Sequence, residues 1–186
     1  MSKFKFIDTG IDGLVVIEPT IYGDSRGYFM ETYNYNDFKA AGFDMVFVQD
    51  NQSMSKKGVL RGMHFQKNSP QGKLVRVISG EVFDVAVDVR KGSSTFGKWF
   101  GVYLSQENKR LFYVPEGFAH GFLVMSDTAE FCYKCTAFYD PTDEGEFLWN
   151  DKDIAIEWPT VEGCERMLSE KDIKLSSFKE CGNIFK

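Results

Sequence analysis

Histidine is scarce in this chain, and neither a long apolar run nor an excess of positive charge is present. The 186 residues include two histidines, and 22 Lys and Arg against 27 Asp and Glu give a net charge of -5. Binding nucleic acid in general needs a basic face that neutralises phosphates, so this balance argues against it. No apolar run approaches the ~20 residues that cross a membrane, and the N-terminus lacks the apolar core of a signal peptide. We therefore expect a cytoplasmic protein that binds neither nucleic acid nor membrane.

The cysteines do not form a recognisable metal motif. They are Cys132, Cys135, Cys164 and Cys181. Cys132 and Cys135 have a metal-like spacing, but residues three apart on a strand point to opposite faces, and no second pair completes a zinc site. The His-x-His pair typical of metal-binding β-barrels is also missing. We expect reduced, structural cysteines and no bound metal.

Short strand patterns dominate the chain. Strands are predicted over 14–18, 28–33, 45–50, 74–79, 82–90, 99–104, 110–114, 120–126 and 130–139, with a short helix over 36–41. Gly80-Glu81 reads as the turn of a hairpin. In the strand that follows, apolar residues alternate with Asp84, Ala86 and Asp88, which indicates one wet face or a polar cavity. The pattern predicts one all-β domain over 1–186, a β-sandwich or jelly roll, with a C-terminal tail from about 173.

Both histidines lie in polar segments bounded by glycines. Arg61-Gly-Met-His-Phe-Gln-Lys-Asn-Ser-Pro-Gln-Gly-Lys73 places His64 among basic residues in what we predict to be a tight loop. His120, in Val-Pro-Glu-Gly-Phe-Ala-His-Gly, is predicted to lie in a turn between strands. Imidazole changes its charge near neutral pH, so the two segments suggest proton transfer, with plain surface histidines as the alternative.

Cations, amides and tyrosines add candidate binding groups. Arg26, Arg61, Lys73 and Lys171 lie in polar, turn-like surroundings, where they either bind phosphate oxygens or remain solvated. Gln49-Asp50-Asn51 follows an apolar strand and offers amides to a base or a sugar, or simply ends the strand. Tyr133 and Tyr139 are six apart on one predicted strand and would share a face. One hydroxyl there could donate a proton and the other ring could stack on a heterocycle, unless both are core or rim residues.

Taken in order, several segments resemble the dTDP-4-dehydrorhamnose 3,5-epimerase family. They are Arg61-Gly-Met-His-Phe-Gln66, Gln71-Gly-Lys73, Gly80-Glu-Val-Phe-Asp-Val-Ala-Val-Asp88, Val114-Pro-Glu-Gly-Phe-Ala-His-Gly121, Tyr133-Lys-Cys-Thr136 and Ser169-Glu-Lys-Asp172. The resemblance covers roughly 4–172. Met63 and Phe65 stand where Leu and Tyr are more common in the family, and no functional position is lost. The last dozen residues carry no recognisable motif.

The resemblance implies a cupin-type jelly roll (a double-stranded β-helix) with short flanking helices. It also implies a homodimer and an epimerase that needs no cofactor and no metal. The substrate would be dTDP-4-dehydro-6-deoxy-D-glucose, epimerised at C3 and C5 to dTDP-4-dehydro-L-rhamnose on the route to dTDP-L-rhamnose. Both carbons flank the C4 ketone, so loss of either proton forms an enolate.

The resemblance also implies roles for individual residues. His64 would be the base, Asp172 the carboxylate that orients it, Lys73 the cation that stabilises the enolate, and Tyr133 the proton donor on the opposite face. Tyr139 would stack on thymine. The other substrate-binding positions would be Gln49, Asp50, Asn51, Arg61, His120, Glu144 and Lys171. Arg26, Phe29 and Glu31 match an N-terminal segment that, in the family, reaches the neighbouring subunit's site.

Three other functions stay open on the sequence. A relative with the same fold could epimerise only C3 or only C5, or act as a 3,4-ketoisomerase. A cupin that binds a sugar nucleotide without catalysis would need neither a base nor a proton donor. A metal-dependent cupin oxygenase would need about three or four His or carboxylate ligands, for which the sequence offers two histidines and a Glu. His64, Lys73 and Tyr133 together favour the double epimerase.

Overall fold

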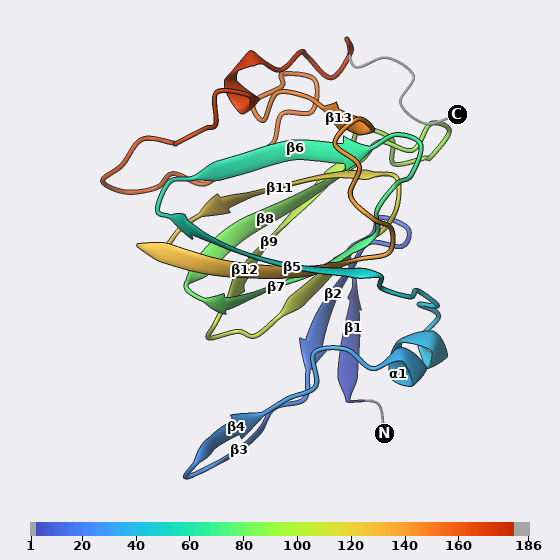
Figure 1. The fold of residues 1–186 in the computed structure, drawn as a ribbon, viewed down its shortest axis with the longest axis vertical. Coiled ribbons are helices and arrows are strands. Elements are labelled where there is room, and N and C mark those ends of the chain that lie inside the picture. The colour runs from blue at the N-terminus through green and yellow to red at the C-terminus, as the bar shows by residue number, and fades with distance from the viewer. Residues whose placement is uncertain (1–2, 181–186) are drawn as a thin grey trace.

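Strands make up most of the regular structure of residues 3–180, the part of the chain that this computed structural model describes (Figure 1). They are β1 (Phe4–Asp8), β2 (Val15–Pro19), β3 (Tyr22–Asp24), β4 (Gly27–Phe29), β5 (Gln49–Lys56), β6 (Leu60–Gln66), β7 (Lys73–Ser79), β8 (Glu81–Asp88), β9 (Trp99–Ser105), β10 (Leu111–Val114), β11 (Phe118–Val124), β12 (Thr128–Cys135) and β13 (Glu144–Glu146). The helices are α1 (Tyr35–Ala40) and the 3-10 helix η1 (Asp172–Lys174). None of the described helices is long and apolar enough to cross a membrane.

The strands form two antiparallel sheets that face each other. One sheet has the order β1-β2-β10-β7-β12-β5 and the other β13-β6-β11-β8-β9, while β3 and β4 form a separate ribbon. Buried side chains from both sheets meet in the interior, for example Val75 and Phe131 from the first sheet with Ala86 and Phe122 from the second. This is a jelly roll of cupin type, so the predicted all-β fold with short flanking helices is confirmed.

The predicted hairpin at Gly80-Glu81 is wrong. β7 pairs with β10 and β12, whereas β8 pairs with β9 and β11 in the opposite sheet. The chain crosses between the sheets at Gly80, whose φ is +78° and where an added Cβ would lie 2.0 Å from the Thr128 carbonyl oxygen. Two strong consecutive strand patterns look alike whether the strands pair or cross over, because both have an apolar face to bury.

The alternation of apolar and polar residues in β8 reflects which side chains face the interior of the barrel. Phe83, Val85 and Val87 pack on the outer side of their sheet with residues of β6 and the C-terminal segment. Asp84 and Ala86 point inward and are fully buried. Of the two alternatives, the polar cavity is therefore the one that the structure shows.

Several predicted boundaries and loops need correction. The segment around His64 is strand β6 and not a loop, and the true loop spans 67–72. His120 lies inside β11 and not in a turn. The strand predicted over 45–50 is β5, which begins at Gln49 and runs to Lys56, and of 28–33 only the end of β4 is strand. β12 ends at Cys135, so Tyr139 is not on the same strand as Tyr133. β1, which no pattern predicted, pairs with β2.

The N-terminal segments lie at one edge of the barrel. The Asn34 side chain accepts hydrogen bonds from the backbone N–H groups of Asn36 and Asp37 and so caps α1, which confirms the predicted helix. Phe38 is fully buried against Phe4, Phe6 and Tyr33. The β3–β4 ribbon instead projects away from the two sheets (Figure 1).

The C-terminal segment covers the outer face of the five-stranded sheet. Phe147 is fully buried there, and Phe178 packs edge-on against it. The Phe178 N–H also donates to the Asp151 carboxylate at 2.8 Å. The predicted tail over 173–186 is thus packed as far as Phe178, while 181–186, with Cys181, lie outside the described residues.

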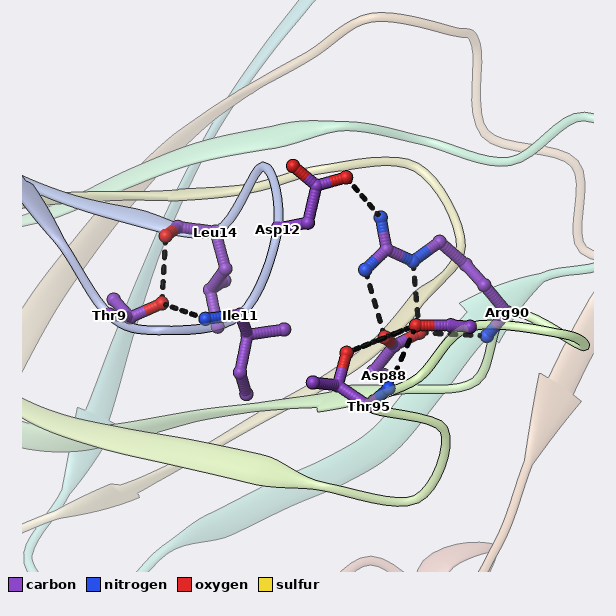
Figure 2. A network of polar contacts seen from close by, with 8 residues as sticks. Thr9, Ile11, Asp12, Leu14, Asp88, Arg90 and Thr95 are labelled. Atoms are coloured by element: carbon purple, nitrogen blue, oxygen red, sulfur yellow. Dashed lines mark hydrogen bonds and ion pairs between the residues drawn. The ribbon is translucent and has the colours of Figure 1, made fainter.

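A buried carboxylate holds together the end of β8 and the loop that follows it. Asp88 accepts hydrogen bonds from the Arg90 guanidinium and from the hydroxyls of Ser93 and Thr95 (Figure 2). Burial alone would raise the pKa of Asp88, but these donors outweigh it and lower the pKa to about 2. Arg90 also reaches Asp12 at 3.9 Å, which links the network to the loop between β1 and β2.

Candidate active site

A cavity of about 450 Å³ opens between the two sheets. A second cavity of about 220 Å³ adjoins it. His64, Lys73 and Tyr133 line both cavities, so these three side chains lie where the two compartments meet. The combined size suits a ligand larger than a monosaccharide.

The two histidines lie opposite each other on neighbouring strands. His64 of β6 and His120 of β11 are register partners, and the register shifts between His120 and Phe122. The irregularity depends on close backbone approach, because a Cβ added to Gly62 would lie 2.6 Å from the Gly121 Cα. The two glycines thus allow the strands to approach where both imidazoles enter the cavity.

His64 is bonded to a carboxylate from the far end of the chain. Its Nε2 lies 2.7 Å from Oδ1 of Asp172, which is almost fully buried in η1. The Ser169 hydroxyl donates to the other oxygen, Oδ2, at 2.8 Å. Burial alone would raise the pKa of Asp172, but the hydrogen bonds from His64 and Ser169 lower it, so the carboxylate is charged at neutral pH. The pair fixes the ring through Nε2, and Nδ1 is the nitrogen left to take up a proton.

His120 has a similar partner. Its Nε2 lies 2.8 Å from Oδ1 of Asp84, and Asp84 is completely buried. Burial raises the pKa of Asp84, while the imidazole and, more weakly, Lys73 oppose that shift. Two His–Asp pairs therefore border the same cavity.

Lys73 and Tyr133 complete the junction from the six-stranded sheet. Lys73 is the first residue of β7 and is half-buried, and burial lowers its pKa. Tyr133 lies on β12 opposite Asn51 and Val75. Burial raises the pKa of Tyr133, so its hydroxyl keeps its proton at neutral pH, as a proton donor must. His64 belongs to the other sheet, so the imidazole and the phenol approach the cavity from opposite walls.

A group of ion pairs lies beside His64. Lys171 contacts Oε2 of Glu144 closely and Oε2 of Glu146 at 3.1 Å, and the same Glu146 oxygen is 3.7 Å from His64 Nε2. Partial burial alone would lower the pKa of Lys171, but the two carboxylates raise it. His64, Glu146 and Asp172 come within 4.8 Å of one another. Asp172 binds the imidazole and Glu146 the ammonium of Lys171, so these side chains belong to one ion-pair network.

The structure brings most of the predicted site residues together. Arg61, His120, Lys171 and Asp172 line the larger cavity, and Gln49, Asn51, Tyr139 and Glu144 line the smaller one. Tyr139 lies beside the cavity although β12 ends before it, since its N–H donates to the Gln49 side chain at 2.9 Å. Arg61 donates to the neutral Ser55 hydroxyl at 3.1 and 3.3 Å, so this contact leaves its charge uncompensated.

Four predicted residues lie away from these cavities. Asp50 points to the outer face of its sheet and pairs with Lys134 at 2.6 Å. Arg26 pairs with Asp24, Phe29 is 64% exposed, and Glu31 pairs with Lys3. The last three belong to the β3–β4 ribbon and the chain that follows it, which this subunit does not fold over its own site.

Two site residues were missed by sequence reasoning. Asp84 had a usable signal, since it is a charged residue within an otherwise apolar strand that the structure buries on both sides. Glu146 had none, because β13 is three residues long and is placed only by its pairing with β6.

The cysteines behave as predicted where they are described. Cys132 borders the cavity on the outer face of the sheet and Cys135 the smaller inner cavity, so their thiols diverge. Both are free, as is Cys164, and Cys181 lies outside residues 3–180.

A jelly-roll barrel with a histidine–carboxylate pair facing a tyrosine across a junction of two cavities defines an acid–base enzyme of the cupin type. The family model for dTDP-4-dehydrorhamnose 3,5-epimerase matches residues 8–180, and this chain belongs to that family.

Individual relatives agree with this assignment. The chain is 54% identical over 180 residues to the dTDP-4-dehydrorhamnose 3,5-epimerase of Methanothermobacter thermautotrophicus, covering 97% of each protein. Its fold superposes with a TM-score of 0.91 on the dTDP-6-deoxy-D-glucose 3,5-epimerase of Legionella pneumophila, crystallised with dTDP-4-keto-L-rhamnose, at 51% identity and covering 95% of this chain and 93% of that one. It also resembles a 3'-monoepimerase from Streptomyces bikiniensis in complex with dTDP-quinovose, with a TM-score of 0.87 and 33% identity, covering 95% of this chain and 90% of that one.

Proposed function

We propose that this protein epimerises dTDP-4-dehydro-6-deoxy-D-glucose at C3 and C5 to give dTDP-4-dehydro-L-rhamnose, in dTDP-L-rhamnose biosynthesis. One observation carries the proposal beyond family membership. His64 and Tyr133 belong to opposite sheets and meet at the junction of the two cavities. Inverting a carbon requires a base on one face and an acid on the other, and this placement supports that requirement.

The reaction follows from the groups at the junction. His64 takes the proton from one of the two carbons beside the ketone, and the electrons of the C–H bond move into the C4 carbonyl to form an enolate. The Lys73 ammonium stabilises the negative oxygen, an electrostatic role that needs a fixed cation where charge develops. Tyr133 then gives its proton to the opposite face of the carbon, and the carbonyl re-forms. Solvent reprotonates Tyr133 and removes the proton from His64. The same steps, in either order, account for C3 and C5.

Asp172 supports the base during these steps. Its charge lies 2.7 Å from His64 Nε2. The imidazole becomes cationic when it takes the substrate proton, and a buried carboxylate at this distance stabilises that charge. In this scheme no step needs a metal or an organic cofactor.

The remaining cavity residues would bind the nucleotide. The smaller cavity, with the Tyr139 ring and the side chains of Gln49, Asn51 and Glu144, is suited to thymidine. Arg61, His120 and Lys171 are cations or potential cations near the larger cavity, and we assign them to the diphosphate. Arg61 is the strongest candidate of these, because it donates to the neutral Ser55 hydroxyl, which leaves its charge available to a phosphate.

We also propose that a second copy of the chain completes each site. The β3–β4 ribbon projects from the barrel and exposes Tyr22, Tyr28 and Phe29, a surface that favours burial against a partner. Arg26 and Glu31 have no role in the cavities of their own subunit. Placed over a neighbouring site, Arg26, Phe29 and Glu31 would supply the three N-terminal contacts expected from the family.

Mixing two inactive variants tests this arrangement. Arg26→Ala damages the donated arm and His64→Asn damages the base, so a hybrid dimer contains one site with an intact arm and an intact base. Recovery of up to about a quarter of the wild-type activity on mixing supports the arm exchange, as the statistics of random pairing require. No recovery, in a mixture that light scattering shows to have exchanged subunits, overturns it.

Deuterium exchange tests the reaction itself. The protein is incubated with dTDP-4-dehydro-6-deoxy-D-glucose in D₂O, and deuterium at C3 and C5 is followed by NMR. Incorporation at both carbons with an L-rhamnose product after a reductase is added supports the double epimerase. Incorporation at one carbon instead supports a single-site epimerase. The 3'-monoepimerase of similar fold is a relative with that activity. Exchange at neither carbon contradicts both.

A further inference from the structure

Glu146 is a carboxylate beside His64 for which neither the family resemblance nor the reaction scheme provides a role. It ends β13 and is the register partner of His64 on β6. Its Oε2 lies 3.7 Å from His64 Nε2, and its side chain is 21% exposed. A carboxylate at this distance interacts favourably with a cationic imidazole, and partial burial screens the interaction less than bulk water would.

The same oxygen holds the segment that carries Asp172. Lys171 Nζ lies 3.1 Å from Glu146 Oε2, and Lys171 is the residue before Asp172. The segment is also fixed upstream, where the Leu60 N–H donates to the Met167 carbonyl at 2.9 Å and the Met167 N–H to the Gly58 carbonyl at 2.8 Å. Lys171, which Glu144 and Glu146 hold together, thus forms the attachment nearest to the His64–Asp172 hydrogen bond.

Charged and titratable groups face His64 from every surrounding element. Three carboxylates lie on the side of β13 and η1, with the single ammonium of Lys171 between two of them. The groups are Glu144 and Glu146 of β13, Asp172 and Lys171 of the C-terminal segment, His120 of β11, Lys73 of β7 and Tyr133 of β12, with Asp84 of β8 behind His120. On the β13 side negative charge therefore exceeds positive charge.

We propose that Glu146 is a positioning residue for the epimerase reaction: it stabilises the cationic form of His64 and, through Lys171, holds Asp172 against the imidazole. The inference rests on the proposed function, because it presumes that His64 takes the substrate proton. The ammonium of Lys171 limits the effect, since it neutralises part of the charge of Glu146. The balance between these two side chains then sets how readily His64 holds a proton.

The scarcity of histidine gives a direct test that needs no turnover. The chain has two histidines, so NMR of ring-labelled protein shows two sets of imidazole signals, which a His120→Asn variant assigns. In Glu146→Gln the titration midpoint of His64 is expected to fall, because a neighbouring negative charge is lost. In Lys171→Met it is expected to rise, because the positive charge beside Glu146 is lost. Glu157→Gln, which makes the same change at an exposed position, should leave it unchanged.

Kinetics give the second measurement. Glu146→Gln should lower kcat by about tenfold with KM within about twofold, and the acid limb of the pH–rate profile should move to lower pH. Glu146→Asp, which keeps the charge on a shorter side chain, should recover part of the loss. Opposite shifts of the His64 midpoint in Glu146→Gln and Lys171→Met support the proposal. An unmoved or raised midpoint in a folded Glu146→Gln protein overturns it. If wild-type protein fails to turn over the substrate, the proposed function fails while the titration still measures the charge coupling.

Discussion

His64 and His120 lie opposite each other on β6 and β11, and each is hydrogen-bonded to an almost completely buried aspartate. The partners differ in origin, since Asp84 comes from the adjacent strand β8 and Asp172 from η1, 108 residues beyond His64. The His120 pair is enclosed by the two sheets, whereas the side chain of His64 is 29% exposed. His64 therefore combines a buried, charged partner with access to a ligand, and this combination favours it as the base.

Replacing the base should separate catalysis from binding. His64→Asn keeps a polar side chain at the position and removes the group that changes charge. Turnover should fall by at least ~1,000-fold, because no other group at the junction is placed to take the proton. The affinity for dTDP, measured by calorimetry, should stay within a few-fold. Turnover near the wild-type level would show that another residue is the base.

Replacing Tyr133, the proposed proton donor, should leave deuterium exchange into the substrate in place but prevent inversion of the carbon. In Tyr133→Phe the imidazole still removes a proton and returns one to the same face. Deuterium from D₂O should therefore enter the substrate at an appreciable rate, while formation of epimerised product falls by at least ~100-fold. NMR of the recovered sugar measures both quantities in one sample. Equal losses of exchange and product would contradict the assignment of Tyr133 as the opposite-face acid.

The charge of Asp88 should make the free energy of unfolding depend on pH. Its pKa is about 2 in the folded protein against an ordinary value of 3.8, so its charged form stabilises the fold by about 2–3 kcal/mol at neutral pH. This contribution is fully present above about pH 4 and is lost as the pH falls through 2, because the pKa is lowered by folding. Asp88→Asn should therefore unfold at lower denaturant at pH 7, and its difference from wild type should shrink on acidification between pH 4 and pH 2.

A surface carboxylate provides the control for this experiment. Asp153 pairs with exposed Lys179 at 2.9 Å. Exposed pairs are screened by solvent and contribute little, so Asp153→Asn should leave the free energy of unfolding nearly unchanged at either pH. If both variants lost stability equally, the buried network in Figure 2 would contribute no more to stability than an exposed ion pair does.

The close approach of β6 and β11 should tolerate no side chain at Gly121. A Cβ there would lie 2.7 Å from the Arg61 carbonyl oxygen and 2.8 Å from the Met63 sulfur. Gly121→Ala should cost about 1–3 kcal/mol of stability and also lower activity, because the strands that carry both histidines must separate. Thermal unfolding and turnover measure the two effects. Gly23→Ala, where the added Cβ meets the Gly27 carbonyl oxygen at an ordinary 3.6 Å, should leave the melting temperature nearly unchanged.

Sequence patterns predicted the residues of the site better than they predicted which strands pair. The alternation in β8 revealed a polar interior, because period-two patterning is a local property that the sequence displays directly. Which strands pair is not local, so the β7–β8 crossover looked like a hairpin. Glycines and polar residues made β6 look like a loop, although Gly62 is there to allow close backbone approach and His64 to face a cavity.

The site residues show the same division. His64, Lys73, Tyr133 and Asp172 were predicted from motif resemblance, and the structure gathers all four around one cavity. Glu146 was missed because only the pairing of β13 with β6 brings it near His64, and a three-residue strand leaves no periodic signal. Asp50 was grouped with Gln49 and Asn51 on sequence adjacency, yet neighbouring residues on a strand point to opposite faces, and it lies on the outer one.

The position of Asp172 far along the sequence also has a consequence for folding during synthesis on the ribosome. The histidine emerges long before its carboxylate partner, which is separated from it by 108 positions and lies in η1, the last helix of the described chain. A nascent polypeptide can assemble both sheets, from β1 to β13, before Asp172, the hydrogen-bonded partner of the imidazole, is available. A chain truncated before η1 would therefore keep the strands of both sheets but lack the carboxylate that orients the proposed base.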